Sequence, residues 1–428
     1  MRRIYEQAAN VAIWLGRAYE ELDLTSLAFN LLQDLHLHIS NKKYLMNTIW
    51  DSKTVDSLES VANLFNRDYW DRVWIVQEVN SARHITVKCG KYTIPWVHIK
   101  SVQEMILNDD DLAQLILRRG ISEPRLSGLG TSFYDRGVRA MEIPAWDLDQ
   151  ATVPDIYTLL SVFWQKAATN PRDKVYALIG LSTARDDEAF SIDYSLSVRE
   201  VYINLVKYLA TSRKLDVIVS VPRGSNDFDL PSWVPDWTVS TSQFGGTIID
   251  HSRHGSEQGK TPFSAAGSTL AEAEILHNNQ VLKTRGVRLG EIVSVGLQSH
   301  RDSMGDLSVG IPVILDWYNR VCDTVACPGD AQVDAFARCI FMDGFQPSDY
   351  VYETELELME RVVGAMFLAG AQLLPPGDLP SQLDIWRNRD EDEVRRANDF
   401  MIKACDLTAC RRWFVLQANV VGMKSVSF

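Results

Sequence analysis

The segment VAIWL, residues 11–15, decides the fold class, because it is an unbroken apolar run that ends at Gly16. Five apolar residues in a row are typical of a strand that is buried on both faces, as in a parallel sheet covered by helices. Such a strand needs paired neighbours, and only the ten residues MRRIYEQAAN precede it. We therefore expect either that later strands pair with it or that the chain begins inside a domain.

Helical and strand patterns follow this segment along the chain. Leucines at helical spacing predict a helix over residues 24–35, and further helices are expected over residues 54–66 and 71–79. The alternating run RHITVKCG and the following KYTIPW predict a β-hairpin that ends at Pro95. Its buried face would carry three residues of the first run: Ile85, Val87 and Cys89. The N-terminal part is thus predicted to be a mixed α/β domain.

The rest of the chain changes character several times. Residues 97–119 are helical by pattern, and residues 120–150, rich in Gly and Pro, form a linker or long loop. Capping-box spacings, Thr152 with Asp155 and Ser197 with Glu200, predict the starts of two further helices. Short β-type runs such as DVIVSV follow, then two more helices over residues 311–324 and 351–373, and the closing RRWFVLQANVVGMKSVSF predicts a strand or two. We predict four parts: an α/β domain over residues 1–98, a helical region over 99–215, a small β-rich region over 216–300, and a helical C-terminal region over 301–428 that ends in a strand.

Composition excludes several classes of protein. The chain has 428 residues, 46% hydrophobic and 23% charged, which is typical of a soluble globular protein of two or three domains. A net charge of −13 argues against a nucleic-acid binder, which needs a basic face. The N-terminus lacks the apolar core of a signal peptide, and the longest apolar stretch, Val362 to Leu374, is too short to span a bilayer. We therefore expect a cytoplasmic protein without a membrane span.

Metal and nucleotide motifs are weak in this sequence. The six cysteines include no CxxC pair, so we interpret them as buried thiols and expect no metal site. His251 and His254 lie in a polar loop without a third ligand, and GLGTSFYDRG lacks the context of a dinucleotide fingerprint. We expect no bound cofactor. Trp233 and Trp237, in LPSWVPDW, either stack a ligand or fill a corner between a strand and a loop, and we favour the corner.

Glu78 is the candidate catalytic residue, because it is a lone carboxylate inside the apolar stretch DYWDRVWIVQEV, residues 68–79. At helical spacing, Trp74 shares a face with Glu78. A carboxylate beside a tryptophan can be desolvated and can hold a cationic or ribose-bearing ligand. The alternative, which the spacing alone favours, is a surface glutamate paired with Arg72 or Arg83.

Several blocks of this sequence resemble fungal heterokaryon-incompatibility (HET) domain proteins. MRRIYEQAANVAIWLG and RDYWDRVWIVQEVNSARHITVKCGKYTIPW look like the second half of the HET domain. NPRDKVYALIGLSTARDDEAFSIDYSLSVREVY, LPSWVPDW and CRRWFVLQANVVGM look like the region that follows it. Two earlier motifs of the family, L-S-Y-x-W-G and W-I-D-x-x-C-I-x-Q, are absent. The resemblance therefore implies a chain truncated within the HET domain, as a natural fragment or a truncated gene model.

The resemblance also carries expectations about fold and function. HET domains are similar to TIR domains, which implies a partial TIR-like, flavodoxin-like parallel sheet. Some TIR proteins cleave NAD with a glutamate in a W-x-x-x-E pattern, which Trp74 to Glu78 matches. Glu78 would then be catalytic, with Trp74 supporting it and NAD as substrate, in an enzyme weakened by the missing half. The first expectation is a signalling protein of fungal non-self recognition and programmed cell death that acts through protein partners or homo-oligomers, whose identity the sequence leaves open.

Overall fold

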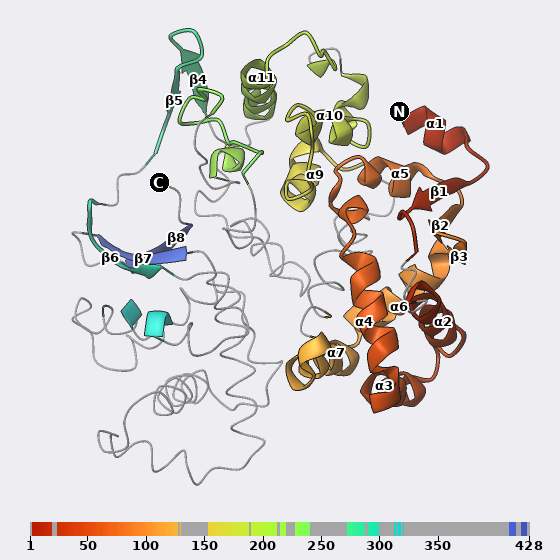
Figure 1. Ribbon diagram of the computed structural model, residues 1–428. Coiled ribbons are helices and arrows are strands. Elements are labelled where there is room, and N and C mark those ends of the chain that lie inside the picture. Colours follow the sequence, from red (N-terminus) through yellow and green to blue (C-terminus); the bar gives the residue numbers. More distant parts are fainter. Residues whose placement is uncertain are drawn as a thin grey trace, which may run out of the picture. The chain divides into compact units, whose positions relative to one another are not determined.

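The computed structural model describes fourteen stretches of the chain, and the elements named below lie within them (Figure 1). The stretches are residues 2–18, 24–126, 129, 153–187, 190–211, 215–219, 227–239, 272–286, 290–298, 312–314, 316–317, 320, 411–416 and 421–425. The chain divides into two compact units, Met1–Asn204 and Leu205–Phe428. Both contain helices and small sheets, so the chain is mixed α/β, as the sequence predicts. The four-part division expected from the sequence stays a prediction.

A three-stranded sheet lies in the first unit. Strand β1, Val11–Trp14, pairs in parallel with β2, Ile85–Cys89, and β2 pairs antiparallel with β3, Tyr92–Pro95. The predicted hairpin is therefore confirmed, with Val87 and Cys89 buried on its inner face. Gly90 is the first residue of the two-residue turn between these strands. Its φ of 57° lies in the left-handed region that favours glycine.

The segment VAIWL is buried on one face and not on two. Val11, Ile13 and Leu15 are buried, whereas Ala12 is exposed and Trp14 is 53% exposed. The expectation of a doubly buried strand was wrong, because helices α2, Leu24–Leu37, and α6, Trp96–Asn108, pack against one face of this sheet. Within the described residues β1 pairs with β2 alone, so later strands supply a partner on one side of it.

The helices of the first unit bury the apolar stripes that the sequence predicts. Leu32, Phe65 and Ile99, from three different helices, are each almost completely buried in one core that also takes in Ile13 and Val87. The helices around this core are α1 Arg2–Gln7, α2 Leu24–Leu37, α3 Lys42–Trp50, α4 Val55–Phe65, α5 Ile75–Ser81, α6 Trp96–Asn108 and α7 Asp110–Ser122. Short 3-10 helices join them over Ser52–Thr54, Asp68–Asp71 and Pro124–Leu126.

Two predicted helices have different bounds in the structure. The pattern over residues 97–119 forms α6 and α7, which are separated at Asp109; its side chain accepts a hydrogen bond from the Leu112 N–H and starts α7. The helix expected from Asp71 begins instead at Ile75. Asp71 ends a 3-10 helix and Arg72 forms a β-bridge with Ala167, where the Val73 N–H donates to the Ala167 carbonyl over 2.8 Å.

Three further helices follow: α9 Ile156–Phe163, α10 Asp173–Ile179 and α11 Val198–Thr211. A 3-10 helix, Thr183–Asp186, lies between the last two. Asp155 is the N-cap of α9, and its side chain accepts from the Thr158 N–H over 2.8 Å, whereas Thr152 lies outside the described residues. The box at the start of α11 is confirmed: the Ser197 N–H donates to Glu200 over 2.8 Å, and the Glu200 N–H donates to the Ser197 hydroxyl over 3.2 Å.

The second unit contains two small antiparallel sheets. One is formed by β4 Ala273–Leu276 and β5 Val281–Thr284, and the other by β6 Ile292–Gln298, β7 Arg411–Leu416 and β8 Val421–Ser425. The closing strands are therefore confirmed, whereas part of DVIVSV forms a 3-10 helix, Asp216–Val219. Trp233 and Trp237 are buried, and the Trp233 indole donates to the Gln280 carbonyl over 3.3 Å, which agrees with the corner interpretation. His251, His254, five of the six cysteines and the predicted helix over 351–373 lie outside the described residues.

Candidate functional site

Trp70 fixes the stretch DYWDRVWIVQEV in the core of the first unit. Its side chain is completely buried, and its indole N–H donates to the Leu64 carbonyl over 2.8 Å. The Trp70 carbonyl accepts a hydrogen bond from the buried Lys166 ammonium over 2.7 Å. Trp70 also packs against Trp96, with ring centroids 6.1 Å apart. These contacts set the direction in which α5 leaves the core.

Glu78 lies in the first turn of α5 and is half-buried between two tyrosines. The Tyr69 hydroxyl donates a hydrogen bond to the Glu78 carboxylate, and Tyr5 of α1 is also hydrogen-bonded to it. Burial, followed by Glu78, raises the pKa of Tyr5 to about 12, and the same two causes raise the pKa of Tyr69. Both hydroxyls therefore stay protonated at neutral pH and act as donors to the carboxylate. The Arg72 guanidinium lies 5.6 Å from the centroid of the Tyr69 ring.

The surface ion pair expected as the alternative for Glu78 is not formed. Among the described residues, Glu78 makes no ion pair with Arg72 or Arg83, and its hydrogen-bond donors are tyrosine hydroxyls. Spacing could not predict these donors, because Tyr69 lies in the 3-10 helix before α5 and Tyr5 lies in α1, about seventy residues earlier in the chain. The carboxylate is thus held by neutral donors at the edge of the unit.

Trp74 has a different carboxylate partner. Its indole N–H donates to one oxygen of Asp173 over 3.0 Å, and the Tyr194 hydroxyl donates to the other oxygen over 2.7 Å. The Arg172 guanidinium lies 5.5 Å from the centroid of the Tyr194 ring. Trp74 and Glu78, although one turn apart, therefore belong to two clusters, each with one carboxylate, two aromatic donors and an arginine. Sequence reasoning missed Asp173 and Tyr194, which lie about a hundred residues further along the chain.

Gln77 joins α5 to α10 beneath these clusters. Its side-chain N–H donates to the Ala177 carbonyl over 2.7 Å, and the residue is 3% exposed. Its other amide atom, Oε1, is buried without a hydrogen-bond partner. A buried acceptor without a donor is costly and uncommon in folded proteins. This oxygen is therefore a notable polar group near Glu78.

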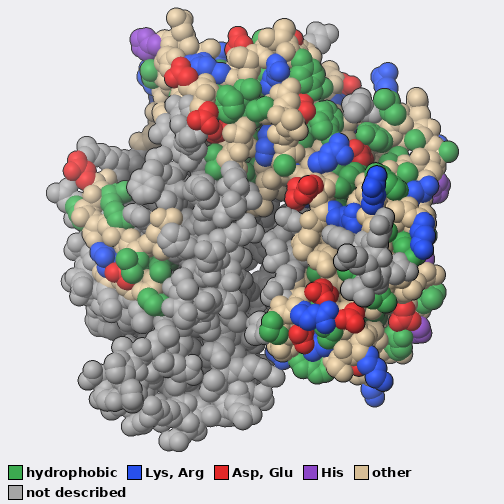
Figure 2. Space-filling model, viewed as in Figure 1, with side chains coloured by type: hydrophobic (Ala, Val, Ile, Leu, Met, Phe, Trp, Pro, Cys, Tyr) green, Lys and Arg blue, Asp and Glu red, His purple; other side chains and the backbone are tan. Residues whose placement is uncertain are grey.

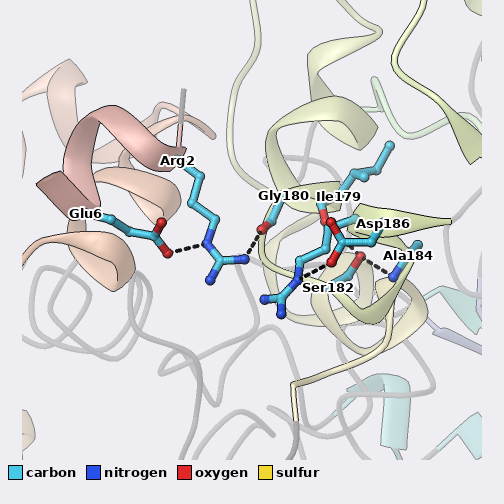
Figure 3. Close-up of polar contacts among 8 residues, drawn as sticks. Arg2, Glu6, Ile179, Gly180, Ser182, Ala184 and Asp186 are labelled. Atoms are coloured by element: carbon cyan, nitrogen blue, oxygen red, sulfur yellow. Dashed lines mark hydrogen bonds and ion pairs between the residues drawn. The ribbon is translucent and has the colours of Figure 1, made fainter.

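Helix α1 covers this region from outside. The Arg2 guanidinium extends from α1, forms an ion pair with Glu6 over 2.6 Å and donates to the Gly180 carbonyl over 3.0 Å (Figure 3). A Cβ at Gly180 would lie 2.8 Å from the Gln77 side-chain nitrogen and 3.9 Å from the Arg2 Cβ. The side chains of Gln77 and Arg2 thus both lie close to Gly180.

The described part of the face in Figure 2 carries charges of both signs. Positive and negative side chains are interspersed over it. The described residues contain no group of three metal-ligating side chains, and none of their helices is both long and apolar enough to cross a membrane.

Residues 1–78 match the family model described as heterokaryon incompatibility protein (HET). This segment is therefore similar to the HET domain. The matched segment runs from α1 to Glu78 in the first turn of α5, so the HET segment contains Tyr5, Tyr69 and Glu78 together.

A curated relative agrees with the family match. The chain is 22% identical over 377 residues to heterokaryon incompatibility protein 6, OR allele, of Neurospora crassa. The alignment covers 75% of this chain and 52% of the relative, so the chain spans about half the length of the curated relative that it matches. No solved structure matches the chain.

Proposed function

We propose that this protein acts in heterokaryon incompatibility, as a cytoplasmic signalling protein of fungal non-self recognition that leads to programmed cell death through protein association. The observation that carries the proposal is the family match over residues 1–78, supported by the similarity to the Neurospora crassa relative. The net charge of −13 and the mixed charges on the face in Figure 2 suit association with proteins more than with nucleic acid.

Inducible expression in a filamentous fungus tests this proposal. We expect the wild-type chain, and the control variant Trp14→Ala, which changes an exposed side chain, to reduce the viable fraction of cells. Trp70→Ala, which removes the centre of the first core, should restore viability at equal expression. Full viability with the wild-type chain would contradict a role in cell death.

A TIR-like arrangement of the first unit is part of the proposal. It is supported by the parallel pairing of β1 with β2, because parallel neighbours require a crossover, and α2 to α5 lie between these strands in the chain. The third strand is antiparallel. An experimental structure with a second parallel neighbour beside β1 would support the arrangement further.

NAD hydrolysis by Glu78 stays a prediction, and no described contact favours it. The Trp74 indole binds Asp173, and the Glu78 carboxylate is occupied by tyrosine hydroxyls. Incubation with NAD, followed by measurement of nicotinamide, tests it directly. Activity lost in Glu78→Gln and kept in Glu104→Gln, an exposed carboxylate, would assign the reaction to Glu78, whereas equal activity in both would remove Glu78 from it.

A further inference from the structure

Helix α1 is held on the first unit by polar contacts and not by apolar burial. None of its six residues is buried, and Ile4 is 65% exposed. A helix of this length is unstable alone in water, because the free-energy cost of forming its first turn exceeds the stabilisation from one or two turns of hydrogen bonds. The helical form of α1 therefore depends on its contacts with α5 and with the end of α10.

Two side chains provide these contacts. Tyr5 is hydrogen-bonded to Glu78, and Arg2 donates to the Gly180 carbonyl while Glu6 neutralises the guanidinium from within α1 (Figure 3). Both contacts run from donors on α1 to acceptors on the unit below. Hydrogen bonds that involve a charged group are stronger than neutral ones, so a small number of contacts suffices to hold so short a helix.

The groups that α1 contacts on the unit below are hydrogen-bond acceptors. This acceptor surface contains the Glu78 carboxylate and the Gly180 carbonyl. The Gln77 side-chain nitrogen, which donates to the Ala177 carbonyl, lies next to Gly180, and Gln77 Oε1 is buried without a hydrogen-bond partner. Such a surface binds donors and cations, and α1 supplies one hydroxyl and one guanidinium to it. Removal of α1 would leave Glu78 with a single described donor, Tyr69.

The segment that joins α1 to the sheet is hydrogen-bonded to the rest of the unit at its sheet end. Asn10 accepts a hydrogen bond from the Thr86 hydroxyl over 3.1 Å, and the Val11 N–H donates to His84 over 2.8 Å. Ala8 keeps one helical hydrogen bond, to Ile4 over 3.1 Å, and Ala9 makes no hydrogen bond that holds it to the unit. We infer that α1 is a releasable strap, pivoting at Ala8 and Ala9, that closes over Glu78 and Gln77 and exposes this acceptor surface when displaced. The inference concerns access to Glu78 and does not depend on the proposed role in cell death.

Hydrogen exchange and carboxylate labelling on the purified chain test the strap. Tyr5→Phe and Arg2→Ala each remove one anchor, so we expect amide exchange in the last turn of α1, including the Ala8 N–H that donates to Ile4, to rise about tenfold or more, as the loss of a charge-assisted hydrogen bond implies. Coupling of Glu78 to an amine by a carbodiimide should rise in parallel. Exchange in β2 should stay at the wild-type rate, which shows that the unit is still folded.

Two matched variants serve as controls. Arg3→Ala changes an exposed arginine of the same helix, and Tyr44→Phe removes a similar tyrosine–carboxylate bond, to Asp34, elsewhere in the unit. Both should leave exchange in the last turn of α1 unchanged. The strap is refuted if the anchor variants behave like the controls, or if Glu78 of the wild-type chain is labelled as fast as Asp186, whose side chain is 87% exposed.

Discussion

Substitution of Trp70 tests whether this residue anchors the stretch that carries Glu78. Trp70→Ala removes a fully buried indole that packs against Phe65, Tyr69 and Trp96. Deletion of a buried aromatic side chain costs about 3–5 kcal/mol, as lost transfer free energy plus a cavity. Trp70→Phe keeps most of the volume but leaves the Leu64 carbonyl without its donor, which costs about 1–3 kcal/mol.

The matched control is Trp14→Ala, because Trp14 is 53% exposed on the open face of β1. Surface substitutions of this kind change the free energy of unfolding by about 0.5 kcal/mol. The expected order of destabilisation is therefore Trp70→Ala, then Trp70→Phe, then Trp14→Ala. Trp70→Ala should therefore lower the free energy of unfolding by at least about 2 kcal/mol more than Trp14→Ala does.

Amide exchange at Leu15 provides the assay, because its N–H donates to the Lys88 carbonyl over 2.9 Å and is protected by the parallel strand pair. If exchange there requires opening of the whole unit, Trp70→Ala should accelerate it about a hundredfold to a few thousandfold, at tenfold per 1.4 kcal/mol. An acceleration no larger than that of Trp14→Ala would refute the role of Trp70. Comparison of Trp70→Ala with Trp70→Phe separates the destabilisation caused by the cavity from that caused by the lost hydrogen bond to the Leu64 carbonyl.

Three other perturbations have outcomes that the structure fixes. Gly90→Ala should destabilise the hairpin by at least about 1 kcal/mol in urea unfolding, because φ is 57° and the new Cβ would lie 2.8 Å from the Ala18 backbone nitrogen; a neutral result would contradict the turn geometry. Ser197→Ala should cost about 0.5–2 kcal/mol by removal of the N-cap, seen as faster amide exchange in the first turn of α11, with Ser195→Ala as the control. Burial and the neighbouring His36 hold the pKa of His98 below its usual value of 6.5, so the folded state resists protonation and the free energy of unfolding should fall as pH drops below 6.5 towards the folded pKa. The urea midpoint should therefore decrease less between pH 7.5 and 5.5 in His98→Gln than in the wild type, and equal decreases would exclude His98 as a source.

Local patterns predicted the elements whose signals lie within a few residues. The period of Leu27, Leu31 and Leu35 predicted α2, and the alternation in RHITVKCG predicted β2 and its buried face. The Ser197 and Glu200 spacing predicted the start of α11, because a capping box needs two side chains that are three residues apart. Each of these features depends on hydrogen bonds or burial within one turn or one hairpin.

Features that depend on distant partners were not predictable in the same way. The helix expected at Asp71 starts four residues later, because the backbone of Val73 bonds to Ala167, more than ninety residues further along the chain. Similarly, VAIWL reads as a doubly buried strand by composition, but Trp14 is exposed since helices cover one face of the sheet. Apolar composition records which residues can be buried, and only the packing decides which of them are.

The candidate site shows the same limit at the level of single side chains. Spacing placed Trp74 and Glu78 on one helical face, yet each is bound by groups from outside that helix: Asp173 accepts from Trp74, and Tyr69 and Tyr5 donate to Glu78. A carboxylate that takes neutral tyrosine donors needs no cation to be satisfied, so the absence of an arginine partner is not a defect of the site. The chemistry open to Glu78 therefore depends less on its place in the W-x-x-x-E pattern than on whether Tyr5, at the far end of the HET segment, stays in contact with it.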